Sequence, residues 1–205
     1  MSDDRALIFA RVRAALAGRP ERTPLPEYPF DIAVSRAAPS GGDLFETFVS
    51  RLERVHGRAF TTPGALAAWL RERGATRGYC DPALVSLVAT TFGTDIALDT
   101  EFRRERVDDY AFGITRAVAG IAETGTLVLD DASTATRLGA LAPWIHVAVL
   151  KRSELHRHVA EAVAALDDDP SIVWVTGPSK TADVEGILIE GVHGPGEEIA
   201  LILDD

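Results

Sequence analysis

The stretch Ile145-His-Val-Ala-Val-Leu150 decides the fold class, because it is a short apolar run rich in β-branched residues, typical of a strand buried on both faces. Between two such runs, residues 153–166 predict a helix that Ser153 caps, with Leu155, Val159, Val163 and Leu166 on its buried face. Buried strands that alternate with helices predict an α/β fold, a layered open sheet, mainly parallel, with helices on both faces. The other runs of this kind, bounded by Gly, Pro or Asp, are residues 111–115, 126–129, 172–176, 187–189 and 199–203.

The first half of the chain predicts helices and short strands in alternation. Asp43 and Glu46 have the spacing of a capping box, and Thr62-Pro63 predicts the start of another helix. A helix is expected at residues 82–89, a surface helix or turn at 101–109, and strands at 58–61, 77–80 and 94–98. Residues 2–18 predict a helix, and the Pro- and Gly-rich residues 18–42 predict an extended arm. We therefore expect an N-terminal helix and arm over residues 1–42 and a single α/β domain over residues 43–205.

Composition limits the classes of function that are open to the chain. The net charge of −10 opposes binding to phosphate backbones, so no nucleic-acid partner is expected. Cys80 is the single cysteine, so the chain cannot by itself form a disulfide or hold an iron–sulfur cluster or a structural zinc ion. No spacing of His, Asp and Glu resembles a metal site. No apolar run reaches the length of a membrane span or the pattern of a signal peptide, so a cytoplasmic protein without a membrane span or bound metal is expected.

The first motif that could carry chemistry is Glu123-Thr-Gly-Thr126, directly before a predicted buried strand. Gly125 can adopt a positive φ or let a ligand approach the backbone closely. Glu123 could serve as a nucleophile or general base, while Thr124 and Thr126 offer hydroxyl groups to a ligand. The alternative is a turn at a strand edge in which the threonine hydroxyls only satisfy backbone groups.

The second motif is Thr176-Gly-Pro-Ser-Lys-Thr-Ala-Asp183, where a predicted strand runs into a polar segment. Backbone N–H groups, hydroxyls and a cation together suit an anion, and ligands of open α/β sheets bind at the carboxyl ends of strands. The alternative is a polar loop in which Ser179 or Thr181 caps a short helix. The residues expected to contact a ligand are Gly177, Ser179, Lys180, Thr181 and Asp183.

A third motif, Glu190-Gly-Val-His-Gly-Pro195, places His193 between glycines in a tight turn. The imidazole could carry a proton or donate to a ligand, or it could only bond a nearby carbonyl and shape the turn. We expect the first two motifs to meet in one pocket, with Glu123 as the catalytic acid or nucleophile and residues 179–183 as an anion-binding turn.

These motifs, together with Gly113-Ile-Thr115, follow one another in an order and spacing that resembles the lactate-utilisation (LUD) domain family. The resemblance covers residues 110–205 and implies a fold similar to the sugar-phosphate isomerase and CoA-transferase group, with His193 as a third wall of the pocket. It also implies a part in oxidising L-lactate to pyruvate, as a ligand-binding or accessory subunit beside separate iron–sulfur proteins. Iron–sulfur clusters are then expected only in those partner subunits, with no cofactor in this chain.

Two other functions stay open, and with them the question whether the chain is an enzyme. Glu123 looks like the glutamate-containing turn of CoA transferases, in which the carboxylate attacks an acyl-CoA and a mixed anhydride forms. The chain would then be a CoA- or acyl-transferase-like enzyme with Glu123 as nucleophile. Ser179, Lys180 and Thr181 could instead hold a small carboxylate ligand, as in a sensor of lactate or a related acid.

Overall fold

The computed structural model of the chain describes residues 2–18, 42–131, 133–166, 171–182 and 187–205. The chain divides into two units, residues 1–36 and 37–205. In the first unit, helix α1 (Ser2–Leu16) confirms the predicted N-terminal helix and carries exposed apolar side chains such as Phe9 and Val12. The boundary expected at residue 42 adjoins residues 19–41, which lie outside the described part of the chain, so it stays a prediction.

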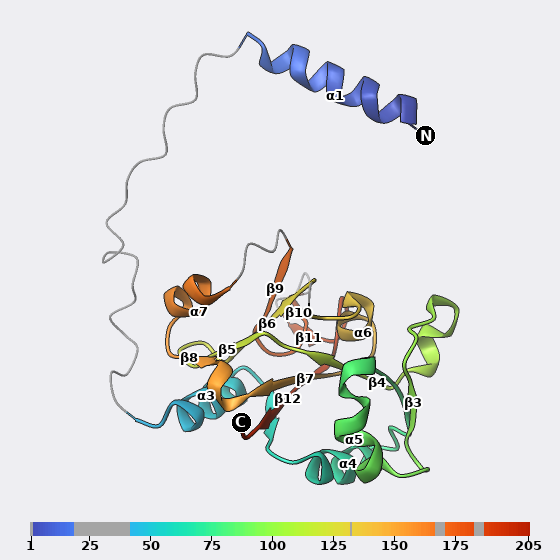
Figure 1. Cartoon of the computed structure of the whole chain (residues 1–205), viewed down its shortest axis with the longest axis vertical. Helices are drawn as coiled ribbons and strands as arrows, with labels where there is room; N and C mark the ends of the chain where they lie inside the picture. The colour runs from blue at the N-terminus through green and yellow to red at the C-terminus, as the bar shows by residue number, and fades with distance from the viewer. Residues whose placement is uncertain (1, 19–41, 132, 167–170, 183–186) are drawn as a thin grey trace. The chain divides into compact units, whose positions relative to one another are not determined.

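A six-stranded sheet in which every neighbouring pair is parallel forms the centre of the second unit (Figure 1). Its strand order is β1-β12-β7-β4-β2-β3. β7 and β12 are neighbouring inner strands and are almost entirely buried, as their apolar sequences predict. The strands are β1 (Arg58–Phe60), β2 (Arg77–Cys80), β3 (Ala97–Asp99), β4 (Phe112–Arg116), β7 (Ile145–Lys151) and β12 (Glu197–Leu203).

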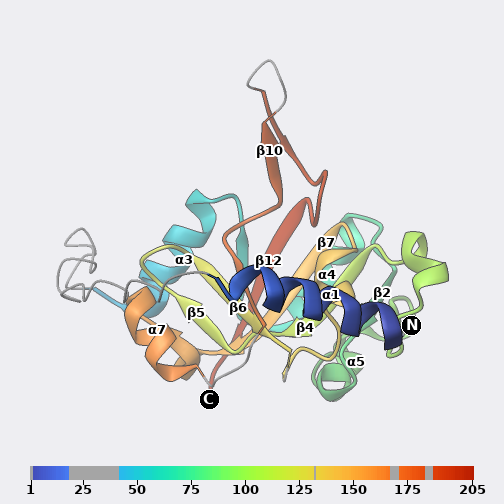
Figure 2. The same ribbon diagram turned by 90° about the horizontal axis from the view of Figure 1, so that it is seen from above.

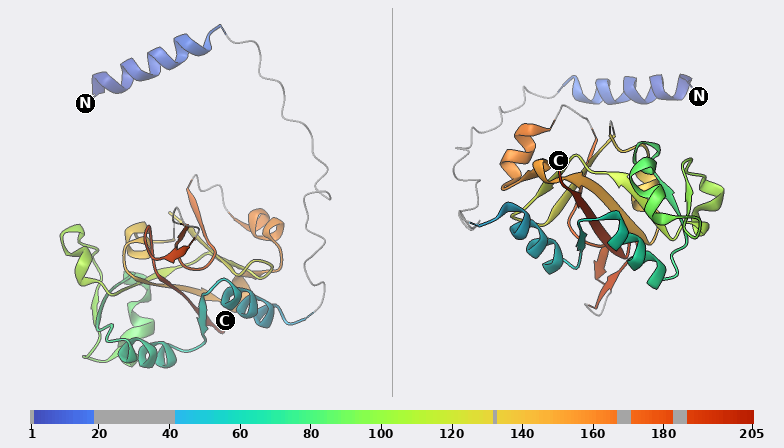
Figure 3. Two further views of the ribbon diagram at one scale, coloured as in Figure 1. Left: turned by 180° about the vertical axis from the view of Figure 1, so that it is seen from behind. Right: turned by 60° about the horizontal axis from the view of Figure 1, so that its bottom comes forward.

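Helices pack on both faces of this sheet. On one face, α4 (Pro63–Glu72) and α5 (Val85–Phe92) lie side by side, which Figure 3 shows from two further directions. The Thr62 hydroxyl begins α4 by accepting from the N–H of Ala65 at 3.2 Å. On the other face, α3 (Leu44–Arg54) and α6 (Arg137–Leu141) share a core with the central strands, formed by Phe48, Leu52, Ala140, Ala148, Leu150, Ala200 and Ile202.

A second sheet of four strands, in the order β8-β5-β6-β9, lies over the face that carries α3 and α6 (Figure 1). Its pairs β5–β6 and β6–β9 are antiparallel, and β5–β8 is parallel. Helix α7 (Val159–Ala165) packs on its far side through Ala162. The strands are β5 (Ala119–Ile121), β6 (Thr126–Asp130), β8 (Leu155–His156) and β9 (Ile172–Val175).

The remaining elements are short. Figure 2 shows β10 (Lys180–Ala182) projecting from the body, where it forms an antiparallel hairpin with β11 (Leu188–Glu190). Three short 3-10 helices, η1 (Pro82–Leu84), η2 (Arg104–Asp109) and η3 (Arg152–Glu154), complete the described structure. No helix among the described residues is long and apolar enough to cross a membrane.

The predicted fold class is confirmed: the central sheet is parallel and helices lie on both of its faces. The helix expected over residues 153–166 is wrong in its first half, because Leu155 and His156 pair with β5 as strand β8. Of the predicted buried face, Leu155 is buried and Leu166 packs against a core cluster, but Val159 and Val163 are exposed and Ala162 is buried in their place. Residues 180–182, expected in a loop or a short helix, are strand β10 because they pair with residues 188–190.

Gly125 fixes how the turn before β6 packs against α3. Its φ is +68°, a left-handed conformation that side chains rarely adopt. A Cβ atom at this position would collide with the backbone of Arg51 and Leu52 in α3. The glycine of the first motif is therefore required by this helix contact, whether or not a ligand binds nearby.

We expect Gly125→Ala to lower the free energy of unfolding by roughly 2–5 kcal/mol, since it adds a steric overlap to the cost of a positive φ. Gly74→Ala is the matched control, because Gly74 has a similar φ of +66° but open space around its Cβ position. That variant should lose only roughly 1–2 kcal/mol. Urea denaturation measures both, and equal losses would contradict the close approach of Gly125 to α3.

Candidate functional site

A chain of threonine hydroxyls joins the first two motifs. Oγ1 of Thr124 lies 2.7 Å from Oγ1 of Thr126, and Oγ1 of Thr126 lies 2.8 Å from Oγ1 of Thr176. The contact follows from sheet pairing, because β6 and β9 are antiparallel neighbours, so that the start of one lies beside the end of the other. The structure thus brings the two turns side by side through hydroxyl groups that bond to each other, while a shared pocket stays a prediction.

Glu123 faces α7. Its Oε1 accepts from the N–H of Val159 at 2.8 Å, and its Oε2 lies 3.1 Å from Nδ1 of His158. These are the first residues of the helix and its cap, where a carboxylate satisfies an unpaired N–H and complements the helix dipole. The Glu123 carboxylate of the first motif is therefore bonded to the start of α7. Thr126 of the same motif instead bonds to Thr176 of the second motif.

A cavity of about 420 Å³ lies where the second and third motifs meet. The two loops are tied together by backbone hydrogen bonds: the Ser179 N–H donates to the Pro195 carbonyl, and the Gly191 N–H donates to the Ser179 carbonyl. Of the residues expected at a ligand site, Gly177, Ser179, Lys180 and His193 line this cavity. Its other lining residues are Leu141, Val173, Trp174, Val175, Thr176, Pro178, Gly194, Pro195 and Glu198.

The remaining expected residues lie elsewhere. Glu123, Thr124, Gly125 and Thr126 are not among the residues that line the cavity, although Thr126 contacts Thr176 on its rim. Thr181 pairs with Ile189 in the hairpin. Asp183 lies outside the described residues, so its expected role as a ligand contact stays a prediction.

Lys180 is held by other groups of the protein. Its Nζ donates to the carbonyl oxygen of Val55, the residue that ends α3, at 3.0 Å. The same nitrogen lies 3.6 Å from Oε1 of Glu190, which is also 2.7 Å from Nδ1 of His56. A cation at the C-terminal end of a helix is favourable. The positive charge of Lys180 is therefore already stabilised by the helix end and by Glu190.

Glu198, which is only 1% exposed, is among the residues that line the cavity. Its Oε1 lies 2.7 Å from Nδ1 of His146, and Nε2 of that histidine lies 2.9 Å from Oγ1 of Thr115. All three side chains are buried, and they come from β12, β7 and β4. Oε2 of Glu198 has no hydrogen-bond partner among the described residues. The three residues form a line of buried polar groups, and Glu198 at one end of it is among the residues that line the cavity.

Strand register explains this line. β7 and β12 are parallel, with His146 directly beside Glu198, and Gly113 of β4 occupies the next position in the same row. Thr115, two residues beyond Gly113, therefore points to the same face as the imidazole. Because Gly113 has no side chain, the backbone of Gly139 in α6 packs there and closes that side.

Burial raises the pKa of the Glu198 carboxyl above its ordinary value of 4.5, because the ionised form would lose its hydration. Nearby His146 acts in the opposite direction, through its charge and its hydrogen bond. A buried acid with a shifted pKa among the residues that line a cavity is a feature that functional sites often share.

Thr115, His146 and Glu198 were missed as site residues by sequence reasoning. The available signal was a histidine inside the apolar run of residues 145–150 and a glutamate directly before that of residues 199–203. Ligands of parallel sheets usually bind at the carboxyl ends of strands. His146 and Glu198 are the second residues of their strands and so lie at the opposite ends, where this rule predicts no site. β9, which led to the second motif, belongs to the smaller sheet, where its pairing is antiparallel.

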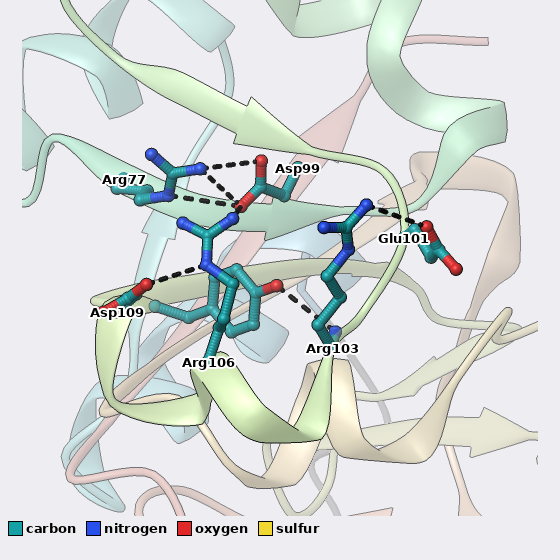
Figure 4. Close-up of polar contacts among 7 residues, drawn as sticks. Arg77, Asp99, Glu101, Arg103, Arg106 and Asp109 are labelled. Atoms are coloured by element: carbon teal, nitrogen blue, oxygen red, sulfur yellow. Dashed lines mark hydrogen bonds and ion pairs between the residues drawn. The ribbon is translucent and has the colours of Figure 1, made fainter.

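A second polar cluster lies at the end of β3 and has compensated charges (Figure 4). Asp99 binds the guanidinium of Arg77 at 2.9 Å and lies 3.6 Å from that of Arg106, which also bonds Asp109 at 2.8 Å. Arg103 pairs with Glu101 at 3.3 Å. Arg77, Arg103 and Arg106 of this cluster are thus paired with acids, which leaves the Glu198 cavity as the stronger candidate site. In the part of the chain that the structure describes, no three His, Cys, Asp or Glu side chains are grouped to hold a metal ion.

The LUD domain model matches residues 86–203, more than half of the chain. A protein from Deinococcus radiodurans named lactate utilization protein C is 31% identical over 92% of this chain and 90% of its own length. A relative of the same name from a Geobacillus species is 27% identical, over 81% of this chain and 80% of its own. The crystal structure of a DUF162 family protein from Deinococcus radiodurans shares the fold, with a TM-score of 0.60 over 78% of this chain and 96% of that one, at 22% identity.

The raised pKa of Glu198 makes stability depend on pH. Because the folded protein holds this proton more tightly than the unfolded chain does, the carboxyl contributes stability that is fully present below pH 4.5 and is lost as pH rises through the folded pKa. We expect Glu198→Gln, which does not titrate, to lose this part of the slope, so that it gains stability relative to the wild type as pH rises.

Urea denaturation at a series of pH values above 4.5 measures this difference. Glu197→Gln is the matched control, because it removes the neighbouring carboxylate on β12, which is partly exposed and pairs with Arg73 at 3.1 Å. Parallel stability curves for the wild type and the Glu198→Gln variant would contradict a raised pKa at this position.

Proposed function

Because the chain belongs to the LUD domain family, we propose that it takes part in lactate utilisation, as a ligand-binding subunit beside iron–sulfur partner proteins. Similarity over most of the chain to proteins named lactate utilization protein C supports a part in lactate utilisation. One observation carries the ligand-binding part: a cavity of about 420 Å³ is lined in part by Glu198, a buried acid with one carboxyl oxygen that has no partner among the described residues. Native proteins seldom leave such an atom unsatisfied unless a ligand or water completes it.

The cysteine content supports the need for iron–sulfur partners. Cluster iron is held mainly by thiolates, and Cys80 is the single cysteine of the sequence. It is buried, and burial together with the nearby Asp81 raises the pKa of its thiol to about 12. A thiol that resists ionisation is a poor cluster ligand, so oxidation of lactate through such clusters would need partner subunits.

The geometry weighs against Glu123 as the nucleophile of a CoA-transferase-like enzyme. A nucleophilic carboxylate needs an oxygen that can reach a substrate, yet both oxygens of Glu123 bond to the start of α7. The sensor alternative depends on a free cation for a small carboxylate, and Lys180 is bonded to Val55 and close to Glu190. Ser179 and His193 remain on the cavity lining for such a ligand.

The proposed role predicts that lactate-dependent electron transfer requires this chain. Reconstituting the chain with its iron–sulfur partners and following dye reduction by lactate should give a rate that falls at least about tenfold when the chain is omitted, as expected when a ligand site in the route is lost. Glu198→Leu should lower the rate, and Glu197→Gln should not. An undiminished rate without the chain would overturn the proposed function.

Glu123→Gln separates the helix-start role of this residue from a nucleophilic one. The amide oxygen of glutamine can still accept from the Val159 N–H, so we expect the fold and the lactate-dependent rate to stay near those of the wild type. An amide cannot form the anhydride of an acyl transfer. Abolished activity in a variant that remains folded by circular dichroism would favour the transferase alternative.

A further inference from the structure

The cavity runs along the outer edge of strand β9. This strand is the last of the smaller sheet, and among the described residues it pairs only with β6 (Figure 1). Val173, Trp174, Val175 and Thr176 all line the cavity. Successive side chains of a strand point to opposite faces, so a cavity over one face would be lined by alternate residues only. A cavity lined by consecutive residues therefore lies along the edge of the strand, where backbone groups can be reached.

The pairing with β6 fixes which backbone groups of β9 face that edge. The carbonyl of Val128 in β6 accepts at 2.9 Å from the N–H of Val118, the residue before β5. Because backbone groups of successive strand residues point in opposite directions, the residues on either side of Val128 direct theirs to β9. Their partners in β9 are Val173 and Val175. The N–H and C=O of Trp174 therefore point away from β6, and no side chain or loop among the described residues bonds to them.

β9 lacks the features that protect the other edge strands. A charged residue or a very short length commonly keeps an edge strand from pairing with another chain. The outer strands of the central sheet, β1 and β3, contain Arg58 and Asp99. The hairpin strands β10 and β11 contain Lys180 and Glu190, and β8 has only two residues. The sequence of β9, Ile172-Val-Trp-Val175, is uncharged and consists of β-branched and aromatic residues, which favours pairing with another strand.

The size of the cavity suits a single extended segment. One strand residue occupies roughly 160 Å³, at a rise of ~3.3 Å, a strand spacing of ~4.8 Å and a sheet spacing of ~10 Å. The cavity of about 420 Å³ thus has room for roughly two or three such residues. Residues 193–195 also line it, so the space lies between β9 and this loop. The β9 strand of a second copy would bring its own sheet with it, which this space does not hold.

The lining of the cavity favours an apolar and uncharged segment. Leu141, Pro178 and Pro195 contribute apolar walls. The ammonium group of Lys180 donates to the Val55 carbonyl oxygen and is close to Glu190, so an acidic segment would find no dedicated cation among the described residues. Burying a charge without a partner is costly.

We propose that this cavity binds an uncharged, apolar segment of a partner protein in an extended conformation, which adds to β9 as a strand and pairs with the N–H and C=O of Trp174. A donor and an acceptor on one strand residue are completed by one residue of an antiparallel neighbour, and addition to a sheet edge is a known mode of peptide recognition. The inference rests on the proposed function only in taking the cavity as a binding site, and it names the class of what is bound there.

A short peptide and its methylated twin test the proposal on the full chain. The probe is acetyl-Thr-Val-Thr-Val-Thr-amide, which is uncharged and rich in β-branched residues. The twin carries methyl groups on its three central backbone nitrogens, so that it has the same side chains but cannot donate to a strand on either edge. We expect the probe to bind at least about tenfold more tightly than the twin, which is the effect of one lost hydrogen bond. NMR titration of the isotope-labelled chain measures both affinities.

Hydrogen exchange locates the pairing. With the probe bound, the backbone N–H of Trp174 should exchange with solvent at least about tenfold more slowly, because it gains a hydrogen-bond acceptor. The N–H groups of β1 are the matched control, since β1 is also an edge strand but does not line the cavity. Their exchange should stay as it is in the free chain.

Two variants separate the backbone of Trp174 from its side chain. Trp174→Pro removes the outward N–H, at an edge position where proline is tolerated, and should bind the probe and the twin equally weakly. Trp174→Ala keeps the N–H and should retain the preference of about tenfold for the probe. Circular dichroism reports whether each variant is folded, and the exchange measurement on the wild type depends on neither.

Any of four results would overturn the inference: no binding of the probe, equal affinities for the probe and its twin, unchanged exchange at Trp174 in the bound chain, or a dimer that pairs the β9 edges of two copies. These results differ from a failure of the proposed function. A chain that is required for lactate-dependent electron transfer but does not bind the probe overturns the strand-addition site alone. A chain that binds the probe at Trp174 but is dispensable for that electron transfer overturns the role in lactate utilisation alone.

Discussion

The hydrogen bond between Nδ1 of His146 and Oε1 of Glu198 is the interaction on which the candidate site depends. It exists because β7 and β12 are parallel neighbours whose register sets these residues side by side. Without the imidazole, neither carboxyl oxygen would have a protein partner among the described residues, and a buried carboxyl without partners is strongly destabilising. Oε2 has no partner among the described residues, so the bond from Oε1 to the imidazole is what compensates the burial of this carboxyl.

Helix α3 organises the loops around this site. Gly125 and Gly177 both have left-handed backbones, with φ of +68° and +73°, and each packs where a Cβ would collide with the backbone of residues 51–55. Lys180 donates to the carbonyl of Val55 at the same helix end. Residues that the sequence offers as ligand contacts thus serve first to fasten the two turns to α3, and their polar character alone does not show a ligand role.

Local sequence patterns were sufficient to predict most of the fold. β2 was predicted with its observed bounds, and the apolar runs that became β4, β6, β7, β9 and β12 were placed within about two residues, because strand propensity and burial act over short stretches. β8 was missed because Leu155 and His156 form a strand only by pairing with β5, more than thirty residues earlier in the chain. The site was harder to predict for the same reason. Thr115, His146 and Glu198 are separated by 31 and 52 residues along the chain, and only the sheet register brings them together.

A buried acid beside a histidine is not what stability alone favours at this point of the sheet. Apolar pairs of similar volume are often as stable as a buried polar pair or more so, and the next residues on the same face, Ala148 and Ala200, are apolar. The polar pair occurs only where β7 and β12 begin, beside the loop that carries His193 and Pro195. Residues 193–198 therefore supply part of the cavity lining from one short segment. Because stability alone does not require the carboxyl and Glu198 is among the residues that line the cavity, ligand binding is the physical reason that best explains its presence.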